Sequence, residues 1–383
     1  MSENTQPTIH KGLGGVVVDS TAVSKVVPET NSLTYCGYPV QDLAANCSFE
    51  EVAYLLWNGE LPTPEQLREF SDRERSLREL EPGLVDLVRG LPTTCHPMDV
   101  LRTAVSWIGT QDPDAYSRDS EHIRDSGMHL LAKLPTIVAL DMRRRQGLDF
   151  IAPDPELGFT ENFLSMSFGR EEGSPALNPE DIHAFDVSMI LYAEHSFNAS
   201  TFTSRVVTST MSDSYSAITA AIGALKGPLH GGANEAVMET MLEIGDPANA
   251  EQWVTDALAK KQLIMGFGHR VYKKGDSRVP TMEAAFKALA ENHDGAKWVE
   301  MYDRMAATVD EAKGMKPNLD FPSGPAYYLL GFEVEFFTPL FVMSRITGWI
   351  AHIIEQSEDN RLIRPLSAYH GPDQREIPSG HAA

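Results

Sequence analysis

Hydrophobic residues recur every three or four positions through most of the chain, a spacing that places them on one face of an α-helix. Capping patterns agree with this spacing. Ser48-Phe-Glu-Glu51 forms a capping box before a run that stops at Asn58-Gly59, and Asn178-Pro179 places a cap and a proline at another helix start. Further helices are predicted at 98–108, 121–147, 200–225, 235–244, 251–262, 281–292, 296–313 and from Thr338 to about Gln356.

Strand patterns are few. Only Val16–Val18, the neighbourhood of Leu33 to Tyr35, and Ile151 alternate or cluster as short strands do. The segment Pro317–Gly324 carries prolines on both sides of Asp320, and we interpret it as a rigid loop. No internal repeat or low-complexity segment interrupts the chain. The pattern therefore predicts a mainly all-α protein.

The predicted helices divide at a sharp break. Segment 216–225 is rich in small residues, which allow close helix packing in a core or at a subunit interface, and Lys226-Gly-Pro228 ends it abruptly. We expect a hinge here. The predicted large domain comprises residues 1–227 and 329–383, and a smaller domain comprises 228–328.

Composition narrows the classes of partner. The chain has 383 residues and a formal net charge of −22, so neither nucleic acid nor an anionic membrane is expected as its main partner. Phe336–Ile354 is apolar but contains Arg345 and His352, which predicts a buried helix and no membrane span. The first residues lack the pattern of a signal peptide, and the three cysteines are too few for a disulfide framework. We expect a cytoplasmic protein with reduced thiols.

Candidate chemistry lies where glycine, proline or asparagine interrupts the pattern. His230 stands between glycines and a helix end, His269 follows Gly266-Phe-Gly268, and Asp320 lies between two prolines. Two imidazoles and a carboxylate at such breaks can move a proton on and off carbon. Each also has an ordinary explanation, because His230 can cap a helix, His269 can begin a solvated basic turn, and Asp320 can serve a turn.

Arginines form the second group of candidates. Arg345 falls within an apolar helical run, where a guanidinium must pair with an internal acid or receive an anionic ligand. Arg278 closes the basic segment after His269, and Arg361 and Arg364 follow the last predicted helix. For each of these taken alone, an internal ion pair is the ordinary explanation.

Taken together, the segments resemble the citrate synthase family in order and spacing. The matching regions are Lys226–Asn234, Gly266–Arg278, Pro317–Gly324, Thr338–Arg364, Glu194–Phe202 and Gly37–Leu43, so the resemblance spans nearly the whole chain. Within the family, His96-Pro-Met-Asp99 and Asn318–Ala326 are most similar to the short bacterial type that makes 2-methylcitrate as well as citrate. The resemblance implies a large and a small helical domain that close over the substrates.

The resemblance implies a role for each candidate. Asp320 would remove the α-proton of an acyl-CoA, neutral His230 would hydrogen-bond the thioester oxygen, and His269 would protonate the attacked carbonyl of oxaloacetate. Hydrolysis of the thioester would release CoA. The implied oxaloacetate ligands are His195, Arg278, Arg345 and, from the neighbouring subunit of a homodimer, Arg364. The implied CoA-binding residues are Leu263, Ile264, Met265, Gly266, Phe267 and Lys273.

The resemblance implies no metal and no redox cofactor, since the acyl-CoA (propionyl-CoA, and acetyl-CoA beside it) is a substrate. Two positions depart from the family pattern. Cys36 stands where arginine is common, which leaves the role of that arginine open here, and Ser277 stands where proline is frequent.

Three other interpretations remain open. The first is a housekeeping citrate synthase specific for acetyl-CoA, because one methylene is worth only about 1–3 kcal/mol of discrimination. The second is a metal-binding protein that uses the histidines and Asp320, although the sequence lacks paired-ligand spacing. The third is a catalytically inactive regulator that binds CoA.

Overall fold

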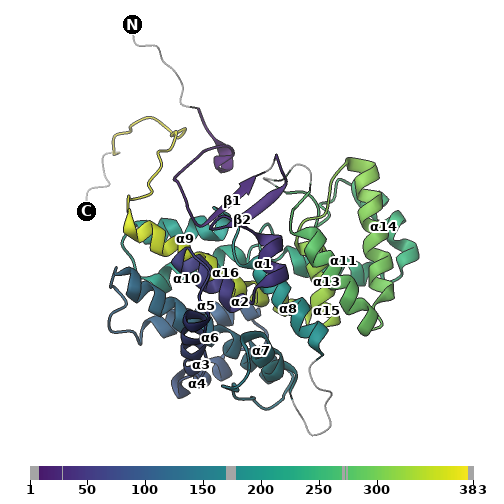
Figure 1. Ribbon diagram of the computed structural model, residues 1–383. Coiled ribbons are helices and arrows are strands. Elements are labelled where there is room, and N and C mark those ends of the chain that lie inside the picture. The colour runs from purple at the N-terminus through teal and green to yellow at the C-terminus, as the bar shows by residue number, and fades with distance from the viewer. Residues whose placement is uncertain (1–7, 28, 170–177, 270–271, 273–274, 378–383) are drawn as a thin grey trace.

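Helices dominate the computed structural model, which describes residues 8–27, 29–169, 178–269, 272 and 275–377 (Figure 1). The mainly all-α prediction is therefore confirmed. The α-helices of the described residues are α1 Val40–Asn46, α2 Phe49–Asn58, α3 Pro64–Ser76, α4 Pro82–Gly90, α5 Pro97–Gly109, α6 Ser120–Arg145, α7 Phe159–Phe168, α8 Pro179–Tyr192, α9 Ala199–Ser209, α10 Ser214–Leu225, α11 Ala233–Ile244, α12 Ala250–Ala259, α13 Val279–Asn292, α14 Ala296–Lys313, α15 Asp320–Leu329 and α16 Phe337–Glu358. Short 3-10 helices cover Lys11–Leu13, Pro247–Asn249 and Val334–Phe336.

The predicted capping residues begin their helices as expected. At α2 the Ser48 hydroxyl accepts a hydrogen bond from the Glu51 N–H, and the Glu51 carboxylate accepts one from the Ser48 N–H. The helix ends at Gly59, whose φ of +82° is the left-handed conformation that glycine adopts at low cost. At α8 the Asn178 side chain accepts from the Glu180 N–H.

Two predicted boundaries are wrong. The single helix expected at 200–225 is two helices, because the chain turns at Met211, with φ +70°, and Asp213 caps α10. Both helices keep an apolar face, so the hydrophobic spacing continues across the break. The loop predicted at Pro317–Gly324 is helical from Asp320 onward. A proline is tolerated in a first helical turn because its missing N–H has no partner there.

The strands form one small antiparallel sheet in the order β1-β2-β3, comprising Ser24–Val27, Ser32–Tyr35 and Tyr38–Pro39. The strand predicted near Leu33 to Tyr35 is β2. The strand predicted at Val16–Val18 is wrong, since this segment lies on the surface and Val17 is 90% exposed. Ile151 also lies outside any strand. Within the sheet, Ser24 of β1 stands opposite Tyr35 of β2.

Helix α16 is the centre of the core. It packs against α2, α6, α8, α9 and α10, and nearly all of its side chains are buried, including Arg345 and His352. Close approach to α6 depends on Gly127, where an added Cβ would lie 2.8 Å from Ile350. Within the described residues, Val334–Glu358 is the one stretch apolar and long enough to cross a membrane, and its most apolar 18 residues are buried inside the fold. The prediction of a buried helix is thus confirmed.

Helices α11, α13, α14 and α15 gather on one side of the molecule, whereas α2 to α6, α9, α10 and α16 form the other side (Figure 1). This grouping follows the predicted small segment 228–328. The two groups are in contact, because α11 packs on α16. Division into two domains that move stays a prediction.

Candidate active site

His230 lies in the turn between α10 and α11, with its side chain aimed at α9. Its Nε2 is 3.3 Å from the backbone nitrogen of Ser200 and 2.8 Å from the Ser200 hydroxyl. A backbone N–H can only donate, so Nε2 accepts and Nδ1 carries the proton. Burial and the charge of Arg345 lower the pKa of His230 to about 3. The imidazole is therefore neutral at ordinary pH and presents one N–H donor.

Both ends of the His230 turn are held by the start of α5, the segment His96–Asp99. Lys226 donates to both carboxylate oxygens of Asp99 at 2.7 and 2.8 Å. His96 Nε2 lies 3.2 Å from the Glu235 carboxylate in the first turn of α11. These two contacts fix where the turn leaves one helix and enters the next.

His269 lies close to a second imidazole. Its ring centroid is 5.0 Å from that of His195 and 4.8 Å from that of Tyr272. Its Nδ1 accepts a hydrogen bond from the Tyr272 N–H at 3.2 Å, so the proton of the neutral ring is on Nε2. Burial and Arg278 lower the pKa of His269 to about 4. This ring is also a neutral donor.

Asp320 is the first residue of α15, and its carboxylate is ordered by Tyr192. The Tyr192 hydroxyl donates to Oδ1 at 2.7 Å, and the Asp320 N–H donates to the Asn318 side chain at 3.1 Å. Burial raises the pKa of Asp320 to about 6, against the opposing effects of Tyr192 and Arg278. A carboxylate with this pKa is ionised at neutral pH and is a stronger base than an ordinary aspartate.

Asp276 connects the arginine group to the Asp320 segment. Its carboxylate accepts from Arg278 Nε at 3.0 Å and Nη2 at 2.6 Å, and also from the Leu319 N–H at 3.3 Å. The paired Arg278 guanidinium holds the pKa of Asp276 far below its usual range, despite burial. Arg278 is thus tied to Asp276, and its Nη1 lies 3.4 Å from the Leu191 carbonyl.

His195 and Arg345 each carry a buried polar atom without a partner among the described residues, namely Nε2 of the imidazole and Nη1 of the guanidinium. Arg345 Nε donates to the Tyr192 carbonyl at 2.7 Å, and the guanidinium lies over the ring of Phe341 at 4.7 Å. Burial lowers the pKa of Arg345 to about 10, so the side chain stays charged at neutral pH. Two such groups are suited to receive an anion, since buried polar groups otherwise cost free energy.

The Phe341 ring lies between the Asp320 segment and His230. It is 4.3 Å from the ring of Tyr192, which binds Asp320, and 6.1 Å from that of His230. The structure therefore brings together six of the predicted site residues, which come from segments far apart in the sequence: His195, His230, His269, Arg278, Asp320 and Arg345. Tyr192 and Asp276 belong to the same site, and sequence reasoning missed both. Neither stands at a break or carries any local pattern apart from proximity to His195 and Arg278.

The predicted CoA-binding loop is joined to the Asp320 segment by backbone hydrogen bonds. The Gly268 N–H donates to the Lys316 carbonyl at 2.9 Å, and the Asn318 N–H donates to the Gly266 carbonyl at 2.9 Å. At Gly266, φ is +85° and a Cβ would meet Val237 at 2.6 Å, so only glycine fits. Of the predicted residues, Leu263 is exposed, Met265 is half-buried, and Ile264 and Phe267 are buried.

Of the remaining predicted residues, one stands apart from the cluster and one is not described. Arg364 is exposed on the segment that follows α16, and its Nη1 lies 3.4 Å from the Pro365 carbonyl. Lys273 lies outside the described residues. Among the residues that are described, no group of three or more His, Cys, Asp and Glu side chains has the arrangement of a metal site.

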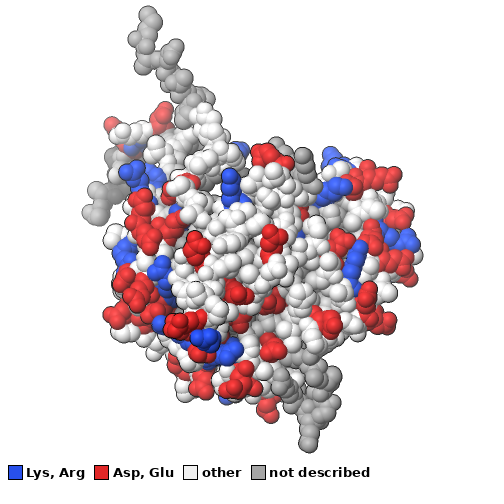
Figure 2. All heavy atoms as spheres, viewed as in Figure 1, with Lys and Arg blue, Asp and Glu red and all other residues white. Residues whose placement is uncertain are grey.

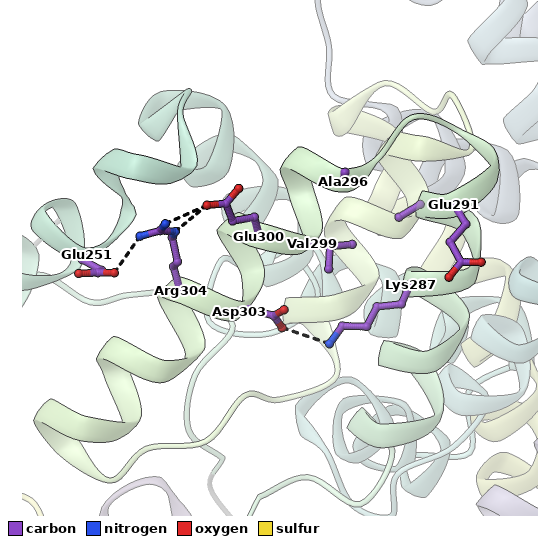
Figure 3. Close-up of a pocket in the computed structure, with 9 residues that line it drawn as sticks. Glu251, Lys287, Glu291, Ala296, Val299, Glu300, Asp303 and Arg304 are labelled. Atoms are coloured by element: carbon purple, nitrogen blue, oxygen red, sulfur yellow. Dashed lines mark hydrogen bonds and ion pairs between the residues drawn. The ribbon is translucent and has the colours of Figure 1, made fainter.

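A hollow of about 710 Å³ lies elsewhere, on α12, α13 and α14 (Figure 3). Both of its cationic side chains are paired with carboxylates. Arg304 pairs with Glu251 and Glu300, each at 2.9 Å, and Lys287 with Asp303 at 3.1 Å. The unpartnered buried atoms of His195 and Arg345 lie in the histidine and arginine cluster and not here, so we place the candidate active site at that cluster.

Comparison with known proteins agrees with this geometry. A sequence model described as "Citrate synthase, C-terminal domain" matches residues 12–366. The chain belongs to the citrate synthase family. It is therefore an enzyme of that family, and the resemblance predicted from its motifs is confirmed.

Several named relatives of the citrate synthase family cover nearly the whole chain. "2-Methylcitrate synthase 2" of Corynebacterium glutamicum is 63% identical and covers 98% of both chains. A 2-methylcitrate synthase of Mycobacterium tuberculosis is 61% identical over 97% of this chain and 93% of its own. A citrate synthase of Mycolicibacterium smegmatis is 59% identical over 98% of this chain and 99% of its own.

A solved structure agrees in fold. Citrate synthase from Thermoplasma acidophilum, solved as a ternary complex with carboxymethyl coenzyme A and oxaloacetate, superposes with a TM-score of 0.92 at 34% identity. The match covers 98% of this chain and 100% of that one. The citrate synthase-like fold is thus confirmed.

Proposed function

We propose that this enzyme condenses propionyl-CoA, and also acetyl-CoA, with oxaloacetate and water to form 2-methylcitrate or citrate and free CoA. One observation carries the proposal. An aspartate with a pKa of about 6 shares a buried site with two neutral imidazoles and with unpartnered arginine and histidine donors. The names of the relatives support the same reaction.

Enolisation comes first in the proposed sequence. The Asp320 carboxylate takes the α-proton of the acyl-CoA, and the C–H bonding pair becomes the C=C of the enolate. His230 Nδ1–H donates to the thioester oxygen, where negative charge develops. A neutral N–H donor that is already in position stabilises the negative charge that develops on this oxygen.

Carbon–carbon bond formation follows. The enol carbon attacks the ketone carbon of oxaloacetate, and His269 Nε2–H gives its proton to the ketone oxygen as that oxygen becomes an alkoxide. Water then adds to the thioester carbonyl, CoA leaves as the thiol, and a carboxylate remains. Closure of the small segment over the site would shield the thioester and enol from premature reaction with water.

Oxaloacetate is the proposed occupant of the unpartnered donors. Arg345 Nη1 and His195 Nε2 would bind its oxygens, and Arg278, held by Asp276, would add positive charge beside them. The segment Leu263–Phe267, together with Lys273, is the proposed contact for CoA. Since Ile264 and Phe267 are buried, the exposed Leu263 and the backbone of the loop are the parts available to a ligand.

We also propose a homodimer in which Arg364 reaches the neighbouring site. The segment after α16 is extended and exposes large apolar side chains, namely Leu362, Leu366, Tyr369 and Ile377. A partner subunit would cover them. Light scattering should give a dimer mass, and Arg364→Ala should raise the KM for oxaloacetate without splitting the dimer. A monomer of full activity would contradict this part.

Acyl preference is tested by kinetics. We expect kcat/KM for propionyl-CoA to exceed that for acetyl-CoA, with both used, because one methylene discriminates by only about 1–3 kcal/mol. The second candidate, a citrate synthase specific for acetyl-CoA, is favoured by the name of the Mycolicibacterium smegmatis relative. Equal or better use of acetyl-CoA would support that candidate.

A further inference from the structure

We propose that the small β-sheet is a positioning device for substrate binding, in which Ser24 and Tyr35 hold His195 in place for oxaloacetate. This inference rests on the proposed role of His195. The sheet lies against the end of α8 in an otherwise helical protein (Figure 1). In the sheet, Ser24 stands opposite Tyr35. The hydroxyls of these two residues form hydrogen bonds with the chain on both sides of His195.

Ser24 contacts both neighbours of His195 through one hydroxyl. Its Oγ donates to Glu194 Oε1 at 2.9 Å and accepts from the Ser196 N–H at 2.9 Å. Ser196 has φ +50°, a left-handed conformation that costs free energy in a residue with a side chain. The bond to Ser24 therefore stabilises an unfavourable turn directly after the imidazole.

Tyr35 holds the residue on the other side. Its buried hydroxyl accepts from the Glu194 N–H at 3.2 Å and lies 2.9 Å from the Glu194 carbonyl oxygen and 3.1 Å from the Ile190 carbonyl oxygen. It can donate to one of these carbonyls at a time. The C-terminal end of α8 is thus bound to β2, so the backbone that leads into His195 is held in place.

Glu194 extends the same support to α16. Its carboxylate is fully buried, and Oε1 accepts from His352 Nε2 at 2.9 Å. The Arg205 guanidinium, which can only donate, binds His352 Nδ1 at 3.0 Å, so the His352 proton is on Nε2. His352 and Arg345 share α16. The sheet, Glu194 and α16 therefore fix the separation of the two unpartnered donors, one on His195 and one on Arg345.

Ordinary core packing would not require this arrangement. The His195 Nε2 has no hydrogen-bond partner among the described residues, so the ring is not anchored through that end. The ring packs against His269 and Tyr272, with centroids 5.0 and 5.6 Å away, and its backbone is held at Glu194 and Ser196. A ligand that needs two fixed groups benefits from that rigidity. Loss of either sheet hydroxyl should then affect the binding of oxaloacetate more than that of acyl-CoA.

The test compares two pairs of variants on the same sheet. Ser24→Ala and Tyr35→Phe remove the bonds to 194–196, whereas Ser32→Ala and Tyr38→Phe remove hydroxyls that bond elsewhere on the surface. We expect the first pair to raise the KM for oxaloacetate about tenfold, the effect of misplacing one hydrogen bond to a charged ligand. The KM for propionyl-CoA and all constants of the second pair should stay within about twofold. Ser24→Thr, which keeps the hydroxyl, should restore the KM for oxaloacetate.

The outcomes separate this inference from the function that it rests on. His195→Gln is measured beside the other variants. If it raises the KM for oxaloacetate while Ser24→Ala and Tyr35→Phe leave it unchanged, the positioning role is wrong and the proposed site stands. If His195→Gln has no effect, the assignment of His195 itself is wrong. If Tyr35→Phe does not fold, the KM for oxaloacetate of Ser24→Ala is compared with that of Ser24→Thr, and this comparison decides whether the positioning role holds. Thermal unfolding shows whether both variants are folded.

Discussion

The two halves of the site are built in different ways. His230, His269 and Asp320 stand at the ends of helices or on a turn, and backbone hydrogen bonds and the start of α5 hold them there. His195 and Arg345 stand at or inside the buried core, where Glu194, His352 and the sheet surround them. The proposed proton-transferring groups thus depend on local backbone contacts, and the proposed anion-binding groups depend on buried side-chain contacts that reach across the core.

Asp276 is the direct link between these halves. It binds the Arg278 guanidinium through two hydrogen bonds, and it also accepts one from the Leu319 N–H beside Asp320. The difference teaches that the positive charge that binds the anion can be held in the core before the substrate arrives. The base, Asp320, is held by fewer contacts, which come from nearby residues. Each prediction below changes one half and asks whether the other responds.

The largest effect is expected for Asp320→Asn. Without the base, kcat for propionyl-CoA should fall by about a thousandfold, within the range for loss of a general base. The KM for oxaloacetate should change little, because its proposed ligands are in the other half. Steady-state kinetics with released CoA as the readout measures both constants. A kcat within tenfold of the parent enzyme would remove Asp320 from the mechanism.

The second-largest effect is expected for Arg345→Lys. A lysine cannot both bond the Tyr192 carbonyl and leave a second fixed donor, so the KM for oxaloacetate should rise about a hundredfold. The KM for propionyl-CoA should be nearly unchanged. Arg124→Lys is a matched control, because Arg124 donates to the Trp57 carbonyl away from the site. Equal rises in both KM values would show that the halves are not separate.

Gly348→Ala tests the packing of the anion-binding half. A Cβ at this position would lie 2.3 Å from Glu194 Oε2 and 2.5 Å from the Ala193 carbonyl, so α16 or Glu194 must shift. We expect a loss of about 2 kcal/mol in the free energy of unfolding. Gly90→Ala is the control, since nothing lies within 4 Å of its added Cβ. Urea denaturation compares the two, and equal stability would show that the close contact is relaxed without cost.

The smallest effect concerns pH. Asp320 must be ionised to accept a proton, so kcat/KM for propionyl-CoA should rise as the pH increases through about 6, where its pKa lies. His230 and His269, with pKa values of about 3 and 4, stay neutral over this range. Tyr192→Phe removes a hydrogen bond that lowers the pKa of Asp320. The midpoint should therefore move upward, by about half a unit to one unit. A downward shift in the pH profile would contradict the assignment.

Local signals in the sequence predicted much of the fold. The caps at Ser48 and Asn178 start helices as predicted, because a capping side chain satisfies backbone groups within three residues of itself. The loop predicted at Pro317–Gly324 is correct only up to Leu319, because Pro322 lies in the first turn of α15, where its missing N–H has no partner. Strand β1 was missed because its pairing with β2 is not visible in its own short pattern.

The candidate site divides in the same way. Breaks in the pattern singled out His230, His269 and Asp320, and an arginine in an apolar run singled out Arg345. Tyr192 and Asp276 carry no such pattern, and only the folded chain places them against Asp320 and Arg278. The charge pattern adds little, because acidic and basic side chains are scattered over the face in Figure 2.

The central claim, that Asp320 removes a proton from the acyl carbon before oxaloacetate is attacked, is tested by isotope. Propionyl-CoA with both α-hydrogens replaced by deuterium is mixed with oxaloacetate and the enzyme. Mass spectrometry measures the deuterium content of the product and the rate at which it forms. The account predicts 2-methylcitrate that retains one deuterium, formed by the parent enzyme and about a thousandfold more slowly by Asp320→Asn. Equal rates of product formation by the two enzymes would contradict it.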